Sequence, residues 1–240
     1  MKEDLYDNYM TTHFGGVHRE IGQEYGIYHT YFSKNYLRHM PKNRKSRILD
    51  IGCGMGHFLY FLEKEGYGNY LGIDISGENI DFCKKQNFNV KLCDVFEYLK
   101  GNNKPFDVIV MNDIIEHFNK KEIIELLKLA RTNLVKNGRL IVKVVNSSNP
   151  ILGPNSRYID FTHEIGFTEE SLMQVLKISG FMECAVYPQD IYIYYHNPLN
   201  FVGMILSKLF NAVFRLLFIL YGRKTTRIFT KSMIAVAIRK

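Results

Sequence analysis

The sequence predicts a doubly wound α/β fold, in which a mostly parallel sheet carries helices on both faces. Short apolar runs typical of buried strands alternate along the chain with amphipathic runs typical of helices. Ser or Thr precedes several of the helical runs, and Gly or Asn follows them. Strands and helices that alternate at this spacing imply parallel strands joined by helical crossovers.

The composition fits one large domain in a reducing compartment. The chain has 240 residues, of which 46% are hydrophobic and 23% charged, so it can bury a full core and is too apolar for disorder. The cysteines Cys53, Cys83, Cys93 and Cys184 lack the spacing of a metal site or a disulfide framework. Residues 1–4 are polar and lack the apolar core of a signal peptide, so we expect a cytoplasmic protein.

The basic excess of the chain is confined to its C-terminal part. The net charge is +7, and residues 189–240 hold eight Lys and Arg against one acid. The first 188 residues carry equal numbers of acids and bases. A nucleic-acid binder usually spreads its positive charge over a groove-facing surface, and the chain has no D/N-P-P-Y motif. We therefore expect no nucleic-acid partner.

A polar and aromatic segment at residues 1–46 is expected to form an N-terminal helical cap. Helical spacing over residues 20–40 ends before Pro41, which cannot continue a helix. Aromatic side chains of this helix are expected to pack in the core more than to line a pocket. They are Tyr25, Tyr28, Tyr31 and Tyr36.

The main body of the sheet is expected between residues 47 and 188, with one further strand near the C-terminus. Gly66 stops the first helix of this body, Ser76 caps the second, and the Asn137-Gly138 pair precedes the fifth strand. The expected elements are strand 47–51, helix 57–65, strand 70–75, helix 76–85, strand 90–93, strand 106–111, helix 120–135, strand 140–145, a helix between Thr168 and Gly180, and strands 181–187 and 233–238.

Three glycines at alternate positions follow the first strand. In the stretch 48–56, Gly52, Gly54 and Gly56 allow the backbone to approach a ligand closely, at the place where α/β sheets bind nucleotides. The spacing differs from the dinucleotide fingerprint, because residue 57 is His. The carboxylate of Asp50 would repel a pyrophosphate but suits a ligand that carries an amino group and a sulfonium.

This stretch resembles the first motif of the class I S-adenosylmethionine-dependent methyltransferases, and three further motifs follow in order. The similarity covers roughly residues 45–187 and resumes at 232–240. It implies a Rossmann-like methyltransferase core at 47–188 and 232–240, with seven strands of which the last is antiparallel. It also implies S-adenosylmethionine as the cofactor and S-adenosylhomocysteine as the product.

The resemblance implies a cofactor site at the ends of the first four strands. Asp74 would hold the two ribose hydroxyls, Asp94 and Val95 would contact adenine, and Asn112 and Asp113 would emerge beside the methyl group. The residues expected to bind the cofactor are Asp50, Gly52, Cys53, Gly54, Gly56, Asp74, Ile75, Asp94, Val95, Asn112 and Asp113.

The fourth strand is followed by a D-x-x-E-H arrangement of Asp113, Glu116 and His117. It is similar to the E-x-x-E-H metal set of ubiquinone-type O-methyltransferases, and it could hold a divalent cation that orients a substrate hydroxyl. Near-identical strings occur across this superfamily without a metal, so a metal is not expected. His117 remains a candidate catalytic residue, with packing in a cofactor-contacting turn as the alternative.

The connection from residue 146 to 167 is long and polar, and such loops form the substrate wall of an α/β sheet. Its string from Asp160 to Thr168, D-x-T-H-x-x-x-F-T, is similar to one in methyltransferases of surface-polysaccharide and other glycan pathways. His163 has the intrinsic pKa to accept a hydroxyl proton near neutral pH, and Asp160 could orient it. The alternative is that His163 only braces the loop.

Residues 189–231 form an apolar and basic insert between the last two strands. The run 199–222 is long enough to span a membrane, but Lys208 and Arg215 would each cost about 2.5–3.5 kcal/mol near the bilayer centre. The last strand must also return to the same sheet. We therefore expect peripheral membrane contact through residues 199–231, and a helical lid or a homodimer interface is the alternative.

Together these observations predict a cytoplasmic S-adenosylmethionine-dependent methyltransferase, peripheral at the inner membrane face. The expected acceptor is a hydroxyl of a sugar, a glycan intermediate or a lipid-linked small molecule. The alternatives are a metal-assisted quinone-type O-methyltransferase, a non-catalytic cofactor-binding partner protein and a nicotinamide-dependent oxidoreductase.

Overall fold

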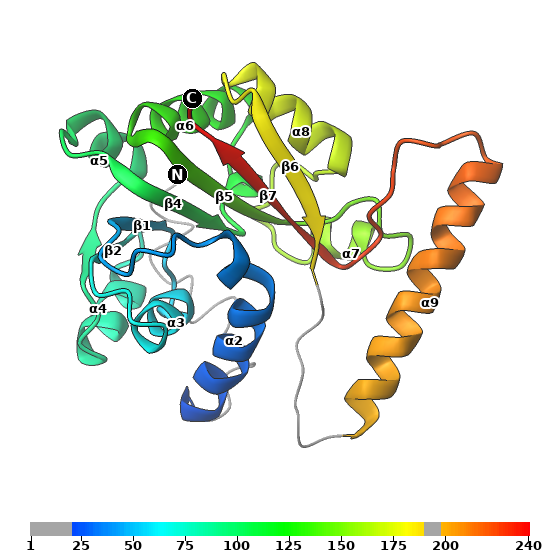
Figure 1. The fold of residues 1–240 in the computed structure, drawn as a ribbon, viewed down its shortest axis with the longest axis horizontal. Coiled ribbons are helices and arrows are strands. Elements are labelled where there is room, and N and C mark those ends of the chain that lie inside the picture. The colour runs from blue at the N-terminus through cyan, green and yellow to red at the C-terminus, as the bar shows by residue number, and fades with distance from the viewer. Residues whose placement is uncertain (1–20, 190–197) are drawn as a thin grey trace.

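A seven-stranded sheet runs through the middle of the molecule (Figure 1). The computed structural model describes residues 21–189 and 198–240. The strand order is β3-β2-β1-β4-β5-β7-β6; β1 to β5 are parallel, and β7 is antiparallel to both of its neighbours. The strands are β1 (Ile48–Ile51), β2 (Tyr70–Asp74), β3 (Val90–Leu92), β4 (Phe106–Asn112), β5 (Leu134–Val145), β6 (Glu183–Pro188) and β7 (Ser232–Ile238). This confirms the expected mostly parallel α/β sheet.

Helices cover both faces of the sheet, as Figure 1 shows. Helices α2, α3 and α4 pack on one face, and α5, α6 and α8 pack on the other. The helices are α2 (Ile21–Tyr36), α3 (His57–Lys64), α4 (Gly77–Lys85), α5 (Val95–Gly101), α6 (Lys120–Thr132), α7 (Gly153–Tyr158), α8 (Glu169–Ile178) and α9 (Pro198–Leu220), with short 3-10 helices η2 (Leu37–His39) and η3 (Ile115–His117).

Strand β4 shows why these runs are apolar throughout. Val108 and Val110 join the core beneath α2, α3 and α4, whereas Ile109 and Met111 join the core beneath α5, α6 and α8. All four side chains are buried. Because successive side chains of a strand point to opposite faces, a strand covered on both faces must be apolar at every position.

The boundary between α6 and β5 differs from the expectation. Helix α6 ends at Thr132 instead of residue 135, and β5 begins at Leu134, which is buried and pairs with Phe106. Asn137 adopts a positive φ of 63°, and the pairing register shifts before Arg139. The Asn137-Gly138 pair is therefore an irregularity inside an early-starting strand. The two short helices α5 and α7 were not expected from the sequence.

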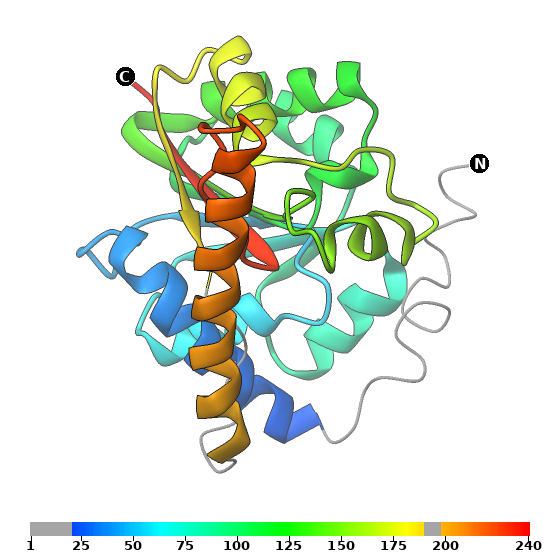
Figure 2. The same ribbon diagram turned by 90° about the vertical axis from the view of Figure 1, so that its right-hand side faces the viewer.

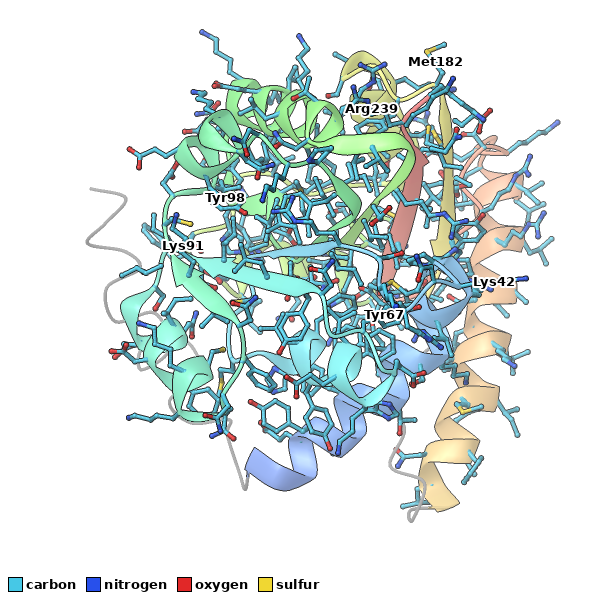
Figure 3. The ribbon with its side chains drawn as sticks, turned by 60° about the vertical axis from the view of Figure 1, so that its left-hand side comes forward. Lys42, Tyr67, Lys91, Tyr98, Met182 and Arg239 are labelled. Carbon is cyan, nitrogen blue, oxygen red and sulfur yellow. The ribbon has the colours of Figure 1, made fainter. Side chains whose placement is uncertain are left out.

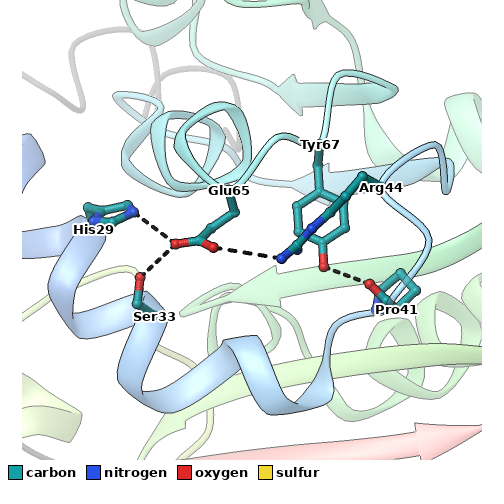
Figure 4. Close-up of polar contacts among 6 residues, drawn as sticks. All are labelled: His29, Ser33, Pro41, Arg44, Glu65 and Tyr67. Carbon is teal, nitrogen blue, oxygen red and sulfur yellow. Dashed lines mark hydrogen bonds and ion pairs between the residues drawn. The ribbon is translucent and has the colours of Figure 1, made fainter.

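The cap helix α2 is fastened to α3 by polar contacts (Figure 4). The Glu65 carboxylate accepts a hydrogen bond from Ser33 Oγ at 3.1 Å and lies 3.0 Å from His29 Nε2. Farther along, the Tyr67 hydroxyl donates to the carbonyl of Pro41 at 2.7 Å. The expected helix over 20–40 is thus confirmed from residue 21 to 36, and the part of the expected cap at residues 1–20 lies outside the described residues.

The insert leaves and re-enters the sheet at one edge. Strands β6 and β7 pair from Glu183 opposite Ile238 to Pro188 opposite Met233, so both ends of the insert lie at the same end of this pair. Helix α9 lies beyond β6, off the body of the molecule (Figures 1 and 2). Residues 199–220 are long and apolar enough to cross a membrane, with a mean hydropathy of 1.8, and no part of that window is buried.

Candidate functional site

The turn after β1 is held open by its glycines and tied to the turn after β2. Gly52, Gly54 and Gly56 all have positive φ, between 50° and 77°. The Gly54 amide donates to Asp74 Oδ2, and the Ser76 amide donates to Asp74 Oδ1, each at 2.8 Å. One carboxylate therefore fixes both turns. The Asn79 side chain and the amide of Ile75 donate to the same carboxylate.

The three glycines have different neighbours. A Cβ on Gly52 would lie 1.9 Å from Ile114 Cδ1, and one on Gly56 would lie 2.7 Å from the Phe88 ring, so packing excludes side chains there. A Cβ on Gly54 would meet nothing within 4 Å. Gly54 is thus the point where the turn faces open space, which a ligand can occupy.

Asp50 lies almost completely buried at the carboxyl half of β1. Its Oδ1 has no hydrogen-bond partner among the described residues. Burial, and then the nearby charge of Asp74, raise the pKa of the Asp50 carboxyl well above its usual range. A buried acceptor without a donor is costly, so a ligand with a cationic or N–H group would stabilise this position.

The next two strand ends complete the edge of the site. Ile75 is exposed beside Asp74, and Val95 is buried as the first residue of α5. Asp94 is the N-cap of α5, because its Oδ1 accepts from the amides of Phe96 and Glu97 at 2.8 and 3.0 Å. Capping fixes the orientation of the Asp94 carboxylate and leaves its second oxygen for another donor.

On its core side, the turn after β1 is held by the side chain of Cys53 and by the cap helix α2. The Cys53 side chain is buried in the core. Its hydrogen bond with Cys83 and its burial raise the pKa of the thiol. Cys53 can therefore reach a ligand through its backbone. The Tyr25 hydroxyl donates to the carbonyl of Met55 at 2.8 Å and braces the same turn.

At the end of β4 the expected residues make contacts within the protein. Asn112 Oδ1 accepts from the Tyr36 hydroxyl at 2.6 Å, so the buried Tyr36 belongs both to the core and to the site. Asp113 has a positive φ of 53°, and its carboxylate forms an ion pair with Lys143. Asp113 is thus neutralised by a cation from the adjacent strand.

Lys143 is a candidate site residue that the motif analysis missed, because it pairs with Asp113 at the end of β4. Its ammonium group is nearly buried and lies 6.0 Å from the centre of the Tyr31 ring, in addition to its pair with Asp113. A sequence signal was present, because Lys143 is the one charged residue in the apolar run 140–145. A lysine inside a buried strand marks a paired charge.

The two polar segments after β4 and β5 meet in one cluster. Thr162 Oγ1 donates to Asp160 Oδ1 at 2.6 Å and lies 2.8 Å from His117 Nδ1. His163 Nδ1 donates to the carbonyl of Ser156 at 3.1 Å, because a carbonyl can only accept. The centres of the His117 and His163 rings are 4.7 Å apart. The structure thus places the three expected catalytic residues together.

Backbone contacts hold this cluster in place. The amide of Glu164 donates to the carbonyl of Glu116 at 2.8 Å, and the Arg157 guanidinium donates to the carbonyls of His163 and Glu164. The amide of Ser147 also donates to the carbonyl of Phe167 at 2.8 Å, which closes the loop at its base. The loop is therefore a fixed wall of the site.

The electrostatics of this cluster keep both buried groups neutral. Burial, and then the adjacent His163, lower the pKa of His117 to about 4. Burial and the charge of Asp113 raise the pKa of Glu116 to about 8. Neither oxygen of the Glu116 carboxylate has a hydrogen-bond partner among the described residues. At neutral pH the site therefore presents an uncharged His117 and a largely protonated Glu116.

The cation-binding geometry differs from the D-x-x-E-H set. Asp113 is paired with Lys143, whereas His117 groups with Asp160 and His163. Ligand atoms of these three residues lie within 4.8 Å of one another. Among residues 21–189 and 198–240, this is the one group of three or more His, Cys, Asp or Glu side chains placed so that it could hold a metal ion. The trio could hold a divalent cation, with nitrogen and oxygen ligands of the kind that zinc and related metals take.

The strand order, the open glycine turn and the acids that end β1, β2 and β3 define a class I S-adenosylmethionine-dependent methyltransferase. The residues fit this cofactor, because Asp50 offers an unpaired buried acceptor and Gly54 faces open space. A family profile described as a methyltransferase domain matches residues 25–182. The chain belongs to this family.

Curated relatives match the same region at low identity. A tRNA U34 carboxymethyltransferase of Pseudomonas fluorescens is 27% identical over 150 residues, covering 57% of this chain and 46% of the relative. A mitochondrial ubiquinone biosynthesis O-methyltransferase of Rattus norvegicus is 28% identical over 111 residues, covering 42% of this chain and 31% of the relative. The chain thus spans less than half the length of these curated relatives.

Solved structures show the same fold. A SAM-dependent methyltransferase from Archaeoglobus fulgidus superimposes with a TM-score of 0.67 at 22% identity, over 89% of this chain and 94% of that one. A magnesium protoporphyrin IX methyltransferase from Synechocystis, with bound SAH, superimposes with a TM-score of 0.60 at 14% identity, over 100% of this chain and 98% of that one. At these identities the likeness establishes the fold.

Substitution of Gly54 by Ala should separate ligand binding from folding. The Cβ meets no protein atom but enters the open space, and φ of 50° adds strain of about 1–2 kcal/mol. We expect calorimetric affinity for S-adenosylhomocysteine to fall at least about tenfold, which is about 1.4 kcal/mol. Gly66→Ala is the control, since it has φ of 80° and open space far from the site. Equal affinity for both variants would contradict the assignment.

Substitution of Glu116 by Gln should change how stability depends on pH. Because the folded state raises the Glu116 pKa from 4.5 to about 8, this group favours folding below pH 4.5 and loses that contribution as pH rises to 8. Over this interval the unfolding free energy of Glu116→Gln should therefore fall less steeply with pH than that of the wild type. The difference in slope should be up to about 1.4 kcal/mol per pH unit. The exposed Glu164→Gln serves as the control and should keep the wild-type slope.

Proposed function

We propose that this protein is an S-adenosylmethionine-dependent O-methyltransferase that uses His163 to deprotonate a hydroxyl acceptor. The observation that carries the proposal is the fixed orientation of His163. Its Nδ1 is committed to the Ser156 carbonyl, so its Nε2 carries the lone pair that can accept a proton. This ring stands on the loop that follows β5, next to the turn that follows β4.

The remaining residues of the cluster orient this base. S-adenosylmethionine supplies a methyl group on an activated sulfonium, so alignment of donor and acceptor does much of the catalytic work. Asp160 holds Thr162, and Thr162 holds His117, whose ring packs against His163. His163 takes the hydroxyl proton at Nε2 as the acceptor oxygen becomes nucleophilic. The low pKa of His117 keeps a second positive charge away from the protonated His163.

The proposed acceptor is a small molecule or a lipid-linked glycan, in keeping with the similarity of the Asp160–Thr168 string to glycan-pathway methyltransferases. The relative from Pseudomonas fluorescens is named for tRNA. In this chain, however, acids and bases balance over the first 188 residues, and the excess positive charge lies in the insert. This distribution favours an acceptor other than nucleic acid.

A second candidate is metal-assisted O-methylation, which the convergence of His117, Asp160 and His163 favours. A divalent cation bound there would lower the pKa of a coordinated hydroxyl and would replace the base. Dependence of turnover on added Mg²⁺ or Zn²⁺ after treatment with a chelator supports this candidate. Full turnover in the presence of the chelator supports His163 as the base.

The proposal includes a location at the cytoplasmic face of an anionic membrane. The apolar residues of α9 are exposed on several sides, and the exposed Arg223, Lys224, Arg227 and Lys231 follow the helix. A helix of this kind lies in the membrane plane, with each basic residue adding about 1 kcal/mol near anionic headgroups. The return of β7 to the sheet argues against a single crossing.

Methyl transfer should be detectable before the acceptor is identified. Incubation of the protein with S-adenosylmethionine and a lipid and glycan extract should yield S-adenosylhomocysteine, and His163→Asn should lower the rate by about 10²–10⁴-fold. The variant should bind S-adenosylhomocysteine with wild-type affinity, because His163 is no part of the cofactor turns. Cofactor binding without turnover by the wild type would indicate a non-catalytic partner protein.

Membrane contact should depend on the insert. Deletion of residues 199–222 should abolish flotation with vesicles of phosphatidylcholine and phosphatidylglycerol, and Arg223→Glu with Lys224→Glu should weaken it. The reversal of two charges removes about 2 kcal/mol of attraction and adds repulsion. Lys84→Glu with Lys85→Glu on α4 is the matched control. Unchanged flotation of the deletion variant would remove the membrane from the proposal.

A further inference from the structure

The exposed apolar surface of the described residues is concentrated in two segments. Most of the exposed large apolar side chains lie in residues 199–221 and 151–161. The four others are Ile75, Leu92, Ile178 and Met182. Contiguous exposed apolar surface marks a site of interaction with a membrane or another molecule. The second segment forms the substrate loop, so this surface reaches the candidate active site.

The loop carries its apolar residues next to the catalytic cluster. Tyr158 is 78% exposed and Phe161 is 93% exposed, whereas Asp160 between them is 5% exposed. Asp160 therefore points inward to the cluster while its neighbours face outward. We name this exposed set the apolar rim. It consists of Ile151, Leu152, Tyr158, Ile159 and Phe161.

A chain of contacts through Phe229 and Asn149 links the apolar rim to α9. Phe229, in the segment that returns to the sheet, packs against Phe214 and Phe218 of α9, with ring centres 6.2 and 4.6 Å apart. The carbonyl of Phe229 accepts from Asn149 Nδ2 at 2.7 Å. Asn149 Oδ1 in turn accepts from the amides of Ile151 and Leu152 at 3.0 and 2.8 Å. The two apolar surfaces are therefore linked through Phe229 and Asn149.

The charge of this region favours a lipid surface over a second copy of the chain. The exposed Arg223, Lys224, Arg227 and Lys231 follow α9, and the chain has no Asp or Glu from residue 198 to 231. The same segment of a second copy would offer these cations no acidic partner. An anionic bilayer neutralises them and covers the apolar side chains at once.

We propose that the apolar rim and α9 contact the same anionic bilayer, so that the active site opens onto the headgroup region. This inference rests on the proposed function. It makes the acceptor an amphiphile, with a hydroxyl-bearing head group that reaches His163 and an apolar tail that stays among the lipids. The rim then shields the acceptor from bulk water as it leaves the bilayer.

The absence of Trp from the chain allows a direct test. Phe161→Trp on the rim and Phe210→Trp on α9 each place a single tryptophan, excited selectively beside the tyrosines, at an exposed position. With vesicles of phosphatidylcholine and phosphatidylglycerol, both should emit at shorter wavelength and should be quenched by brominated acyl chains. Tyr158→Trp provides a second rim probe in case Phe161→Trp folds poorly.

Met182→Trp is the matched control. Met182 is 77% exposed, a fraction similar to that of Tyr158. It precedes β6 and lies near Arg239, at the end of the sheet where β6 begins and β7 ends (Figure 3). Its emission should not change with vesicles. Pure phosphatidylcholine vesicles should give a weaker response at residues 161 and 210, because the basic segment then lacks its anionic partner.

Three results would overturn the inference. Quenching at residue 210 without quenching at residues 158 and 161 would mean that α9 alone meets the bilayer. No quenching at any position would exclude membrane contact altogether. A shift at residue 210 without vesicles, with a dimer mass by light scattering, would mean that a second copy covers α9. Calorimetry with S-adenosylhomocysteine on the same variants reports separately on the cofactor site.

Discussion

The hydrogen bonds accepted by Asp74 are the constraint on which the site depends. Its two oxygens bind the amides of Gly54 and Ser76, and so join the turn after β1 to the start of α4. This arrangement is favourable because β1 and β2 are neighbouring parallel strands, whose carboxyl ends meet at one edge. It also places a second acid near Asp50, whose pKa is raised by burial and then by the charge of Asp74.

Sequence reasoning predicted most of this fold because the strands are buried on both faces. Continuous apolar runs such as β4 can be recognised without tertiary information. The predicted boundary between α6 and β5 was wrong because Leu134 is equally suited to the end of an amphipathic helix and to the beginning of a buried strand. Leu134 belongs to the strand because it pairs with Phe106. A local sequence pattern cannot predict pairing with a residue that is distant in the sequence. Helix α5 was missed for a related reason, because Asp94 was interpreted only as a ligand contact and not as an N-cap.

The candidate site was predicted residue by residue, but its internal contacts were not. Asp160 and His163 were expected to act together, and His117 was assigned to a separate motif. The structure joins them through Thr162, which lies 45 residues from His117 in the sequence. The D-x-x-E-H set of Asp113, Glu116 and His117, which was considered but not favoured as a metal site, does not come together, because Lys143 pairs with Asp113 and His117 groups with Asp160 and His163. Motifs that lie on one strand end reveal candidate residues, and contacts between different strand ends determine what those residues do.

The topology itself brings the insert to the site. Strand β7 lies between β5 and β6, so the loop that follows β5 and both ends of the insert meet at the beginning of β7. There the amide of Asn146 donates to the carbonyl of Lys231, and the amide of Gln189 donates to that of Ser232. Both ends of the insert therefore lie close to the loop that follows β5. The antiparallel direction of β7 is the reason, since a parallel last strand would have to begin at the opposite end of the sheet.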